Sequence, residues 1–210
     1  MKKSLLIFLL GLVSAVLFSG CAPSDRIVVK NDFSSGRYYV RVPSPEIVTL
    51  ELPFTNEEKF VYRIDSFNKE QGFFKVSMTG GSQAAGPGPS ALFYFRGMPL
   101  NLLQKDKTFE LPADASDSAT VMYYLDWDAQ FSFRNFELLR KGSVTAFNYD
   151  VESQLGLICL KGRDNYRECS AAKLIGDKLI YVFQANSKNV KDNLEGFVMQ
   201  AMKGLKRSGS

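Results

Sequence analysis

Short runs in which apolar and polar positions alternate fill most of the chain from residue 37 to residue 150. Aromatic and β-branched residues are common in these runs, and glycine, proline or other turn-forming residues end them, which is the pattern of short strands. The predicted strands are 38–42, 47–52, 60–65, 73–78, 91–95, 108–111, 121–127 and 131–138. The last run slips by one position at Arg134 and Asn135, which predicts a β-bulge. Many short strands with regular turns predict a mostly β protein whose residues 37–150 form an antiparallel, jelly-roll-like β-sandwich.

Residues 151–210 are predicted to form a β-hairpin region and one amphipathic helix that packs on the sandwich. Strands are expected at 144–149, 155–160 and 179–183. The helix is indicated by one apolar stripe at helical spacing, made of Val190, Leu194, Phe197, Val198, Ala201, Met202 and Leu205. Asn189 is a suitable N-cap for it. A helix that lies on a membrane surface or binds a partner is the alternative.

Cys159 and Cys169 flank a segment rich in turn-forming residues. A disulfide between them would close a β-hairpin, and such a bond persists outside the cytoplasm. A redox-active pair is an alternative, although such pairs usually have the spacing C-x-x-C. A metal site built on two cysteines without histidine is a further one.

The N-terminus has the layout of a secretory signal peptide. Lys2 and Lys3 precede an almost uninterrupted apolar segment from Leu5 to Phe18, and small residues follow before Cys21. The apolar segment is shorter than the ~20 residues that a spanning helix needs. Residues 1–20 are therefore expected to be removed, so that the mature chain begins at Cys21.

The segment Leu17-Phe18-Ser19-Gly20-Cys21 resembles the lipobox of bacterial lipoproteins. The resemblance implies cleavage before Cys21, a diacylglycerol on its sulfur and acylation of its new amino group. Several acyl chains hold a protein stably in a bilayer. Ala22, which is not an aspartate, implies sorting to the outer membrane by resemblance to enterobacterial lipoproteins. Residues 21–36 are then a lipidated tether, and a short strand at Ile27-Val28-Val29 is the alternative for that part of it.

Composition and charge exclude several functions. The 210 residues include no histidine, which removes every histidine-based catalytic triad and every histidine metal ligand. There are 26 basic and 22 acidic residues, and loss of Lys2 and Lys3 leaves 24 basic ones. Such a balance, without a long basic run, argues against nucleic-acid binding. We expect no cofactor and no enzymatic activity.

Two features offer weak alternatives to that expectation. Asp114 and Asp117, together with Asp126 and Asp128 on a predicted strand, are candidate Ca²⁺ ligands or hydrolase carboxylates. Two aspartates at such spacing are common on ordinary strands. The glycine- and proline-rich segment 80–89 is either a binding loop or a plain connection, and it lacks the lysine of a phosphate-binding loop.

Residues 46–140 resemble a carbohydrate-binding, galactose-binding-type jelly roll in their strand pattern. The resemblance rests on the alternating runs from Phe60 to Asp65 and from Phe73 to Met78, and on the two runs after residue 120. Alternation leaves four aromatic residues on outer faces, and these are the candidate contacts with a glycan or a partner: Tyr38, Phe73, Tyr94 and Tyr124.

These observations predict a membrane-anchored envelope lipoprotein that acts without catalysis, as a structural or assembly component in contact with another envelope protein. The bilayer is its first partner, through Cys21. The alternative is a glycan-binding module that recognises envelope or extracellular polysaccharide. A hydrolase that depends on the aspartates is the third hypothesis.

Overall fold

The computed structural model describes residues 26–32, 34, 36–43, 47–55, 60–80, 92–112, 114–176 and 179–207. Cys21 and the predicted signal peptide lie outside these residues. Among the helices of the described part, none is long and apolar enough to span a membrane.

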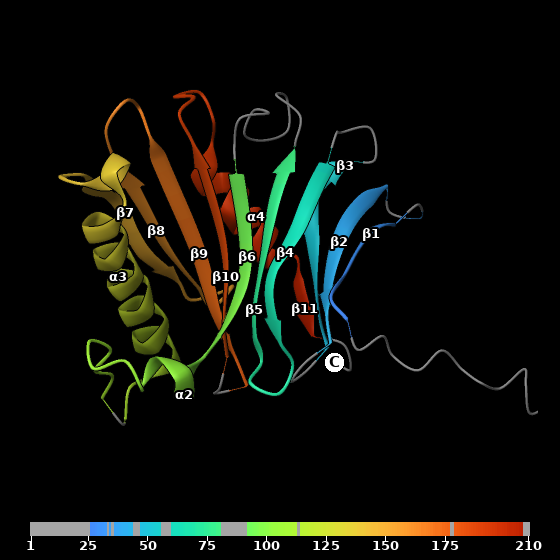
Figure 1. Cartoon of the computed structure of the whole chain (residues 1–210), viewed down its shortest axis with the longest axis horizontal. Coiled ribbons are helices and arrows are strands. Elements are labelled where there is room, and N and C mark those ends of the chain that lie inside the picture. Colours follow the sequence, from blue (N-terminus) through green and yellow to red (C-terminus); the bar gives the residue numbers. More distant parts are fainter. Residues whose placement is uncertain are drawn as a thin grey trace, which may run out of the picture.

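The larger of two sheets is antiparallel and seven-stranded (Figure 1). Its spatial order is β4 (Phe60–Asn68), β5 (Phe73–Gly80), β6 (Leu92–Pro99), β10 (Leu179–Ser187), β9 (Arg167–Ile175), β8 (Leu155–Lys161) and β7 (Ser143–Asp150). Consecutive strands are neighbours in β4–β6 and in β7–β10, so the sheet consists of two meanders joined where β6 pairs with β10. This pairing unites the segments 37–150 and 151–210 in one body. The likeness to a jelly roll goes no further than the two packed sheets.

The smaller sheet has the order β1 (Val28–Asp32), β2 (Arg37–Val42), β3 (Val48–Thr55) and β11 (Leu205–Arg207). Every second side chain of its strands faces the larger sheet, and residues such as Val40, Leu50 and Phe54 join Phe74 and Phe93 in one buried core. The predicted antiparallel sandwich is therefore confirmed. Because β1 pairs with β2, the folded body begins inside the segment 21–36 that was predicted to be a tether.

The C-terminal helix is also confirmed, with shifted ends. It is α4 (Leu194–Lys203), and the stripe residues within it are buried in the same core as the two sheets, which argues against a membrane-surface helix. Val190, expected at the start of the stripe, precedes the helix and is 62% exposed. The predicted cap at Asn189 is wrong, because the side-chain oxygen of Asn193 accepts a hydrogen bond from the Gly196 N–H at 3.0 Å. Leu205, expected at the end of the stripe, belongs to β11.

The strands predicted at 121–127 and 131–138 are wrong, and so is the bulge. Residues from this segment form one long helix, α3 (Asp117–Asn135), followed by a 3-10 turn at Glu137–Leu139. Ser116 caps α3 by accepting a hydrogen bond from the Ala119 N–H. The residues predicted as a strand at 108–111 follow the short helix α2 (Leu100–Leu103) without forming a strand.

A second core lies between α3 and the larger sheet. Val121 and Leu125 of the helix pack there with Ile158 and Val182 of the strands. Gly156 lets the helix approach, since a Cβ at this position would lie 2.6 Å from Cγ1 of Val121. Figure 1 shows α3 in front of the β7–β9 side of the sheet. The helix does not cover the same face of β4–β6.

Candidate functional site

A polar cavity of about 250 Å³ lies where the C-terminal half of α3 meets the sheet. Residues of β5, β6, β9 and β10 and of the end of α3 line it, together with Tyr166, which precedes β9. The lining residues include Lys75, Tyr94, Arg96, Asp128, Phe131, Ser132, Phe136, Tyr166, Glu168, Gln184 and Asn186. Strand alternation explains the polarity, because the opposite faces of the same strands supply the apolar sandwich core.

An ion pair between strand and helix forms one wall of the cavity. The Arg96 guanidinium of β6 donates a hydrogen bond to the Asp128 carboxylate of α3, and the two side chains are only 19% and 15% exposed. Burial opposes the charge of Arg96, but the attraction of Asp128 outweighs it and raises the pKa of the guanidinium. Among the described residues, none accepts a hydrogen bond from the buried Nε of Arg96. A buried donor of this kind is costly and is rare in native structures.

Glu168 of β9 lies deeper and is 5% exposed. The Tyr166 hydroxyl donates a hydrogen bond to its carboxylate at 3.0 Å, and Gln184 is a further hydrogen-bond partner. Burial, and secondarily the charge of Asp128, raise the pKa of Glu168 to about 6. Its charge acts in turn on Tyr166, whose pKa is raised first by burial and then by Glu168. The carboxylate therefore sits in a network in which its charge is only partly compensated.

Lys75 and Tyr94 are on neighbouring strands at the side of the cavity away from α3. The Lys75 ammonium lies 4.8 Å from the centre of the Tyr94 ring, which is the geometry of a cation–π contact. Burial and the charge of Glu168 raise the pKa of Tyr94. At neutral pH, two cations, Lys75 and Arg96, thus balance two anions, Asp128 and Glu168.

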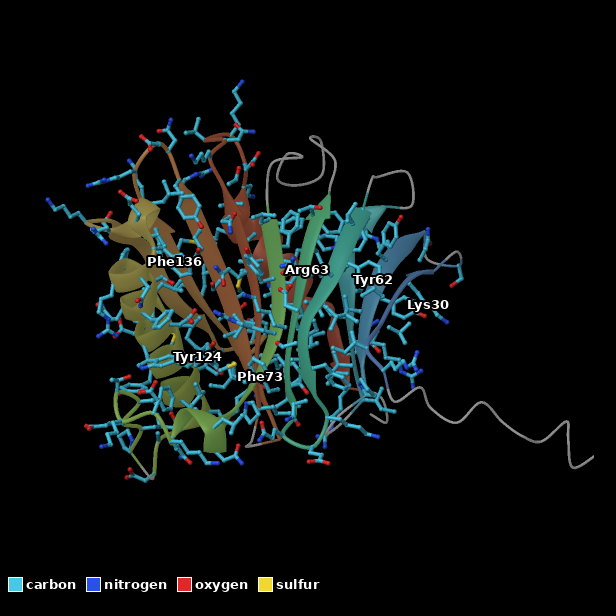
Figure 2. All side chains as sticks on the ribbon, viewed as in Figure 1. Lys30, Tyr62, Arg63, Phe73, Tyr124 and Phe136 are labelled. Carbon is cyan, nitrogen blue, oxygen red and sulfur yellow. A yellow bond between two sulfur atoms is a disulfide. The ribbon has the colours of Figure 1, made fainter. Side chains whose placement is uncertain are left out.

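Two phenylalanines that line the cavity remain open to solvent. Phe131 is 47% exposed and Phe136 is 54% exposed. Figure 2 shows Phe136 beside the upper end of α3, on the face of the sheet where Arg63 of β4 is also seen. Polar groups inside and apolar rings at the edge give the cavity the mixed character of a ligand site.

Only one of the four predicted aromatic contacts belongs to this site. Tyr94 lines the cavity, whereas Tyr124 is 1% exposed and belongs to the core between α3 and the sheet, so it is not a surface contact. Tyr38 is half-buried and stacks on Phe60 with ring centres 4.7 Å apart. Phe73 is half-buried at the start of β5, and Figure 2 shows it at the lower end of the sheet, far from Phe136.

The aspartates do not form a cation site in the described part of the chain, where no cluster of three or more acidic or cysteine side chains could hold a metal. Asp126 and Asp128 are on a helix instead of a strand, and they face different sides of it. Asp126 is exposed, as are Asp114 and Asp117, while Asp128 is the partner of Arg96.

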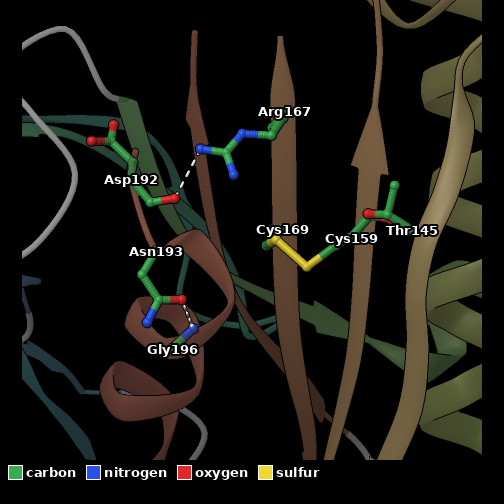
Figure 3. The surroundings of a disulfide bond; sticks show 7 residues. All are labelled: Thr145, Cys159, Arg167, Cys169, Asp192, Asn193 and Gly196. Atoms are coloured by element: carbon green, nitrogen blue, oxygen red, sulfur yellow. Dashed lines mark hydrogen bonds between the residues drawn. A yellow bond between two sulfur atoms is a disulfide. The ribbon is translucent and has the colours of Figure 1, made fainter. Parts of the chain in front are cut away.

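The disulfide between Cys159 and Cys169 is confirmed. The two residues are directly opposite each other on β8 and β9, with Cα atoms 4.1 Å apart, and both are buried in the sandwich core. Figure 3 shows the bond beside the start of α4, where Arg167 donates a hydrogen bond to the Asp192 carbonyl. The bond therefore fixes the strand that bears Glu168, on the face opposite the cavity.

Arg96, Glu168, Tyr166, Phe131 and Phe136 were not predicted as site residues. The sequence contains one signal that could have indicated Arg96. This residue interrupts a segment of otherwise apolar or small residues, and a charge that enters a buried strand usually has a partner or a function. The partner itself is on another element, so that the sequence alone does not identify it.

No protein-family model matches the chain. No curated protein sequence matches it either. Among solved structures, the solution structure of cyanobacterial PsbP (CyanoP) from Synechocystis sp. PCC 6803 is similar over 90% of this chain and 96% of that chain, with 10% sequence identity and a TM-score of 0.44.

Proposed function

We propose that this chain is a lipid-anchored protein of the bacterial envelope that acts without catalysis. It holds another envelope molecule in the polar cavity that Arg96 and Asp128 line, called the Arg96 cavity below. The lipobox-like segment that ends at Cys21 supports the anchor. The cavity supports recognition, because its polar groups are fixed in place before any ligand arrives. The outer membrane is the proposed location, on the basis of Ala22.

The state of the carboxylates favours binding over catalysis. Asp128 is held by Arg96, and Glu168 is held by Tyr166 and Gln184. These hydrogen bonds orient the carboxylates inside the protein, which suits them to support a ligand. A hydrolytic turnover that Asp128→Asn abolishes without unfolding the protein would contradict this proposal.

A protein is the first candidate partner. Phe131 and Phe136 expose large rings at the cavity edge. Exposed aromatic residues contribute strongly to binding when a protein interface forms around them. A glycan is the second candidate. It is favoured by the equal numbers of positive and negative groups in the cavity, because a neutral polar ligand suits such a lining.

Photo-crosslinking in intact cells tests the proposal. A photoreactive phenylalanine analogue replaces Phe136 in the full-length lipoprotein, and the matched control has the analogue at Val190, which is 62% exposed in the turn before α4. We expect a discrete crosslinked product from position 136 and none from position 190. Equal products from both positions, or none from either, would refute recognition at the cavity.

The anchor has its own test. Cys21→Ala removes the only sulfur that the lipobox-like segment offers for lipidation. We expect the variant to lose incorporation of a labelled fatty acid and to leave the membrane fraction after cell breakage, while retaining the Cys159–Cys169 disulfide. A variant that keeps the label would refute lipidation at Cys21.

A further inference from the structure

The size of the cavity limits what enters it. About 250 Å³ is below the ~300–1,000 Å³ of sites that enclose drug-sized ligands. Phe131 and Phe136 are open to solvent at its edge, so a larger molecule can extend outward from the bound part. The cavity therefore suits one ring or one side chain of a larger molecule.

Charge limits the ligand further. An anion would meet Asp128 and Glu168, and a cation would meet Lys75 and Arg96. An anion would add to the negative charge that already penalises Glu168, and a cation would be repelled by Lys75 and Arg96. A neutral ligand avoids both effects.

The hydrogen-bonding groups of the cavity are mixed in kind. Gln184 and Asn186 each offer a donor and an acceptor, and the Nε–H of Arg96 is a donor without an acceptor among the described residues. A hydroxyl group both donates and accepts, so several adjacent hydroxyls match such a lining. An apolar ligand would leave the Nε–H of Arg96 unpaired, at a cost.

The rings at the edge require an apolar surface on the same ligand. Phe131 and Phe136 have no polar atoms in their side chains, and each exposes about half of its area. Covering such a ring is favourable in proportion to the area removed from water. A ligand that combines adjacent hydroxyls with a flat apolar face satisfies both parts of the site, and a sugar ring has this combination.

We infer that the Arg96 cavity binds a single neutral sugar ring of an envelope glycan, with its hydroxyls toward Arg96, Gln184 and Asn186 and its C–H face on Phe131 or Phe136. This inference rests on the proposed function, since it names what the cavity recognises. The glycan is either a free polysaccharide or one that another envelope protein bears. The chemistry of recognition is the same in both cases.

The experiment measures retention on a panel of immobilised glycans that end in neutral hexoses, uronic acids or amino sugars. The full-length lipoprotein is used in detergent. Phe136→Ser removes a ring from the edge, and Phe147→Ser, which removes a phenylalanine of similar exposure on β7, is its control. Gln184→Met removes from the lining, at similar length, an amide that is also a hydrogen-bond partner of Glu168, and Gln130→Met on the exposed side of α3 is its control.

We expect retention on neutral hexoses, weakened about tenfold or more by Phe136→Ser and by Gln184→Met, which corresponds to ~1.4 kcal/mol or more. The two controls are expected to bind like the natural sequence. Circular dichroism and an intact Cys159–Cys169 bond establish that each variant is folded. Protease treatment of material that co-purifies from cells separates the two sources. A glycan that a protein bears remains attached to peptide fragments after digestion, whereas a free polysaccharide carries no peptide.

Two results would overturn the inference. One is preferential retention on the charged sugars, and the other is no retention on any sugar. If retention is absent while the crosslink from position 136 to a protein persists, the sugar inference fails and the proposed function stands. If both are absent, both fail.

Discussion

Replacement of Glu168 by glutamine is expected to stabilise the protein at neutral pH and to leave its stability nearly unchanged in acid. Burial raises the pKa of Glu168 in the folded protein to about 6, from an ordinary value of 4.5. A group whose pKa is raised by folding binds its proton more tightly in the folded state. Its favourable contribution is therefore complete below pH 4.5 and is lost as the pH rises through 6.

The size of the effect follows from the same two values. A shift of one pKa unit corresponds to ~1.4 kcal/mol, so the ionised carboxylate costs the folded state about 2 kcal/mol above pH 7. Glutamine resembles the protonated form, with an oxygen that still accepts the hydrogen bond from Tyr166. The variant should thus gain about 2 kcal/mol at pH 7–8 and almost nothing at pH 4.

Urea unfolding, followed by the fluorescence of Trp127, measures this difference at several pH values. With an m-value of ~2 kcal/mol/M, the midpoint of the variant should lie about 1 M higher at pH 8 and coincide with that of the natural sequence at pH 4. Glu152→Gln changes an exposed carboxylate and should give matching midpoints throughout. A Glu168→Gln variant that is less stable at pH 8, or equally stabilised at every pH, would refute the view that burial penalises this charge.

Three further predictions concern the fold. Gly97→Ala places a Cβ 2.3 Å from the ring of Phe74 and should lower the free energy of unfolding by ~1–3 kcal/mol, measured by urea unfolding; an unchanged midpoint would mean that the ring moves freely. Replacement of both Cys159 and Cys169 by alanine removes the bond that closes a short loop and should lower the free energy of unfolding by about 3 kcal/mol. A reductant should destabilise the natural sequence by a similar amount and leave the variant unaffected. Ser116→Ala removes the N-cap of α3 and should cost ~1 kcal/mol in thermal unfolding, whereas Ser116→Asp should retain most of the stability.

The strands of the sandwich could be predicted from local pattern, but α3 could not. Val121, Tyr123 and Leu125 alternate like strand residues, which led to the wrong prediction. The same segment also has buried residues at helical spacing, at Val121, Tyr124 and Leu125. Burial against the sheet decides between the two patterns, and the absence of a side chain at Gly156 makes that burial possible. Neither fact is local to the segment.

The candidate site was harder to predict than the fold, because its residues meet only through long-range pairing. Arg96 and Gln184 lie on strands that become neighbours when β6 pairs with β10. Asp128 reaches them only because its segment is a helix above the sheet. The disulfide, in contrast, joins adjacent strands of one hairpin, and its short separation made it predictable.

The pairing of β6 with β10 has a consequence for how the chain folds. Phe95 and Phe183 face each other across this pair although they are distant in sequence, whereas β7–β10 are joined by short connections. Contacts between distant segments form late, because closing long loops costs entropy. During synthesis, which begins at the N-terminus, the edge of β6 that pairs with β10 stays open until β10 has been made. An open strand edge can pair with other chains, so the nascent protein is expected to be most prone to aggregation in that interval.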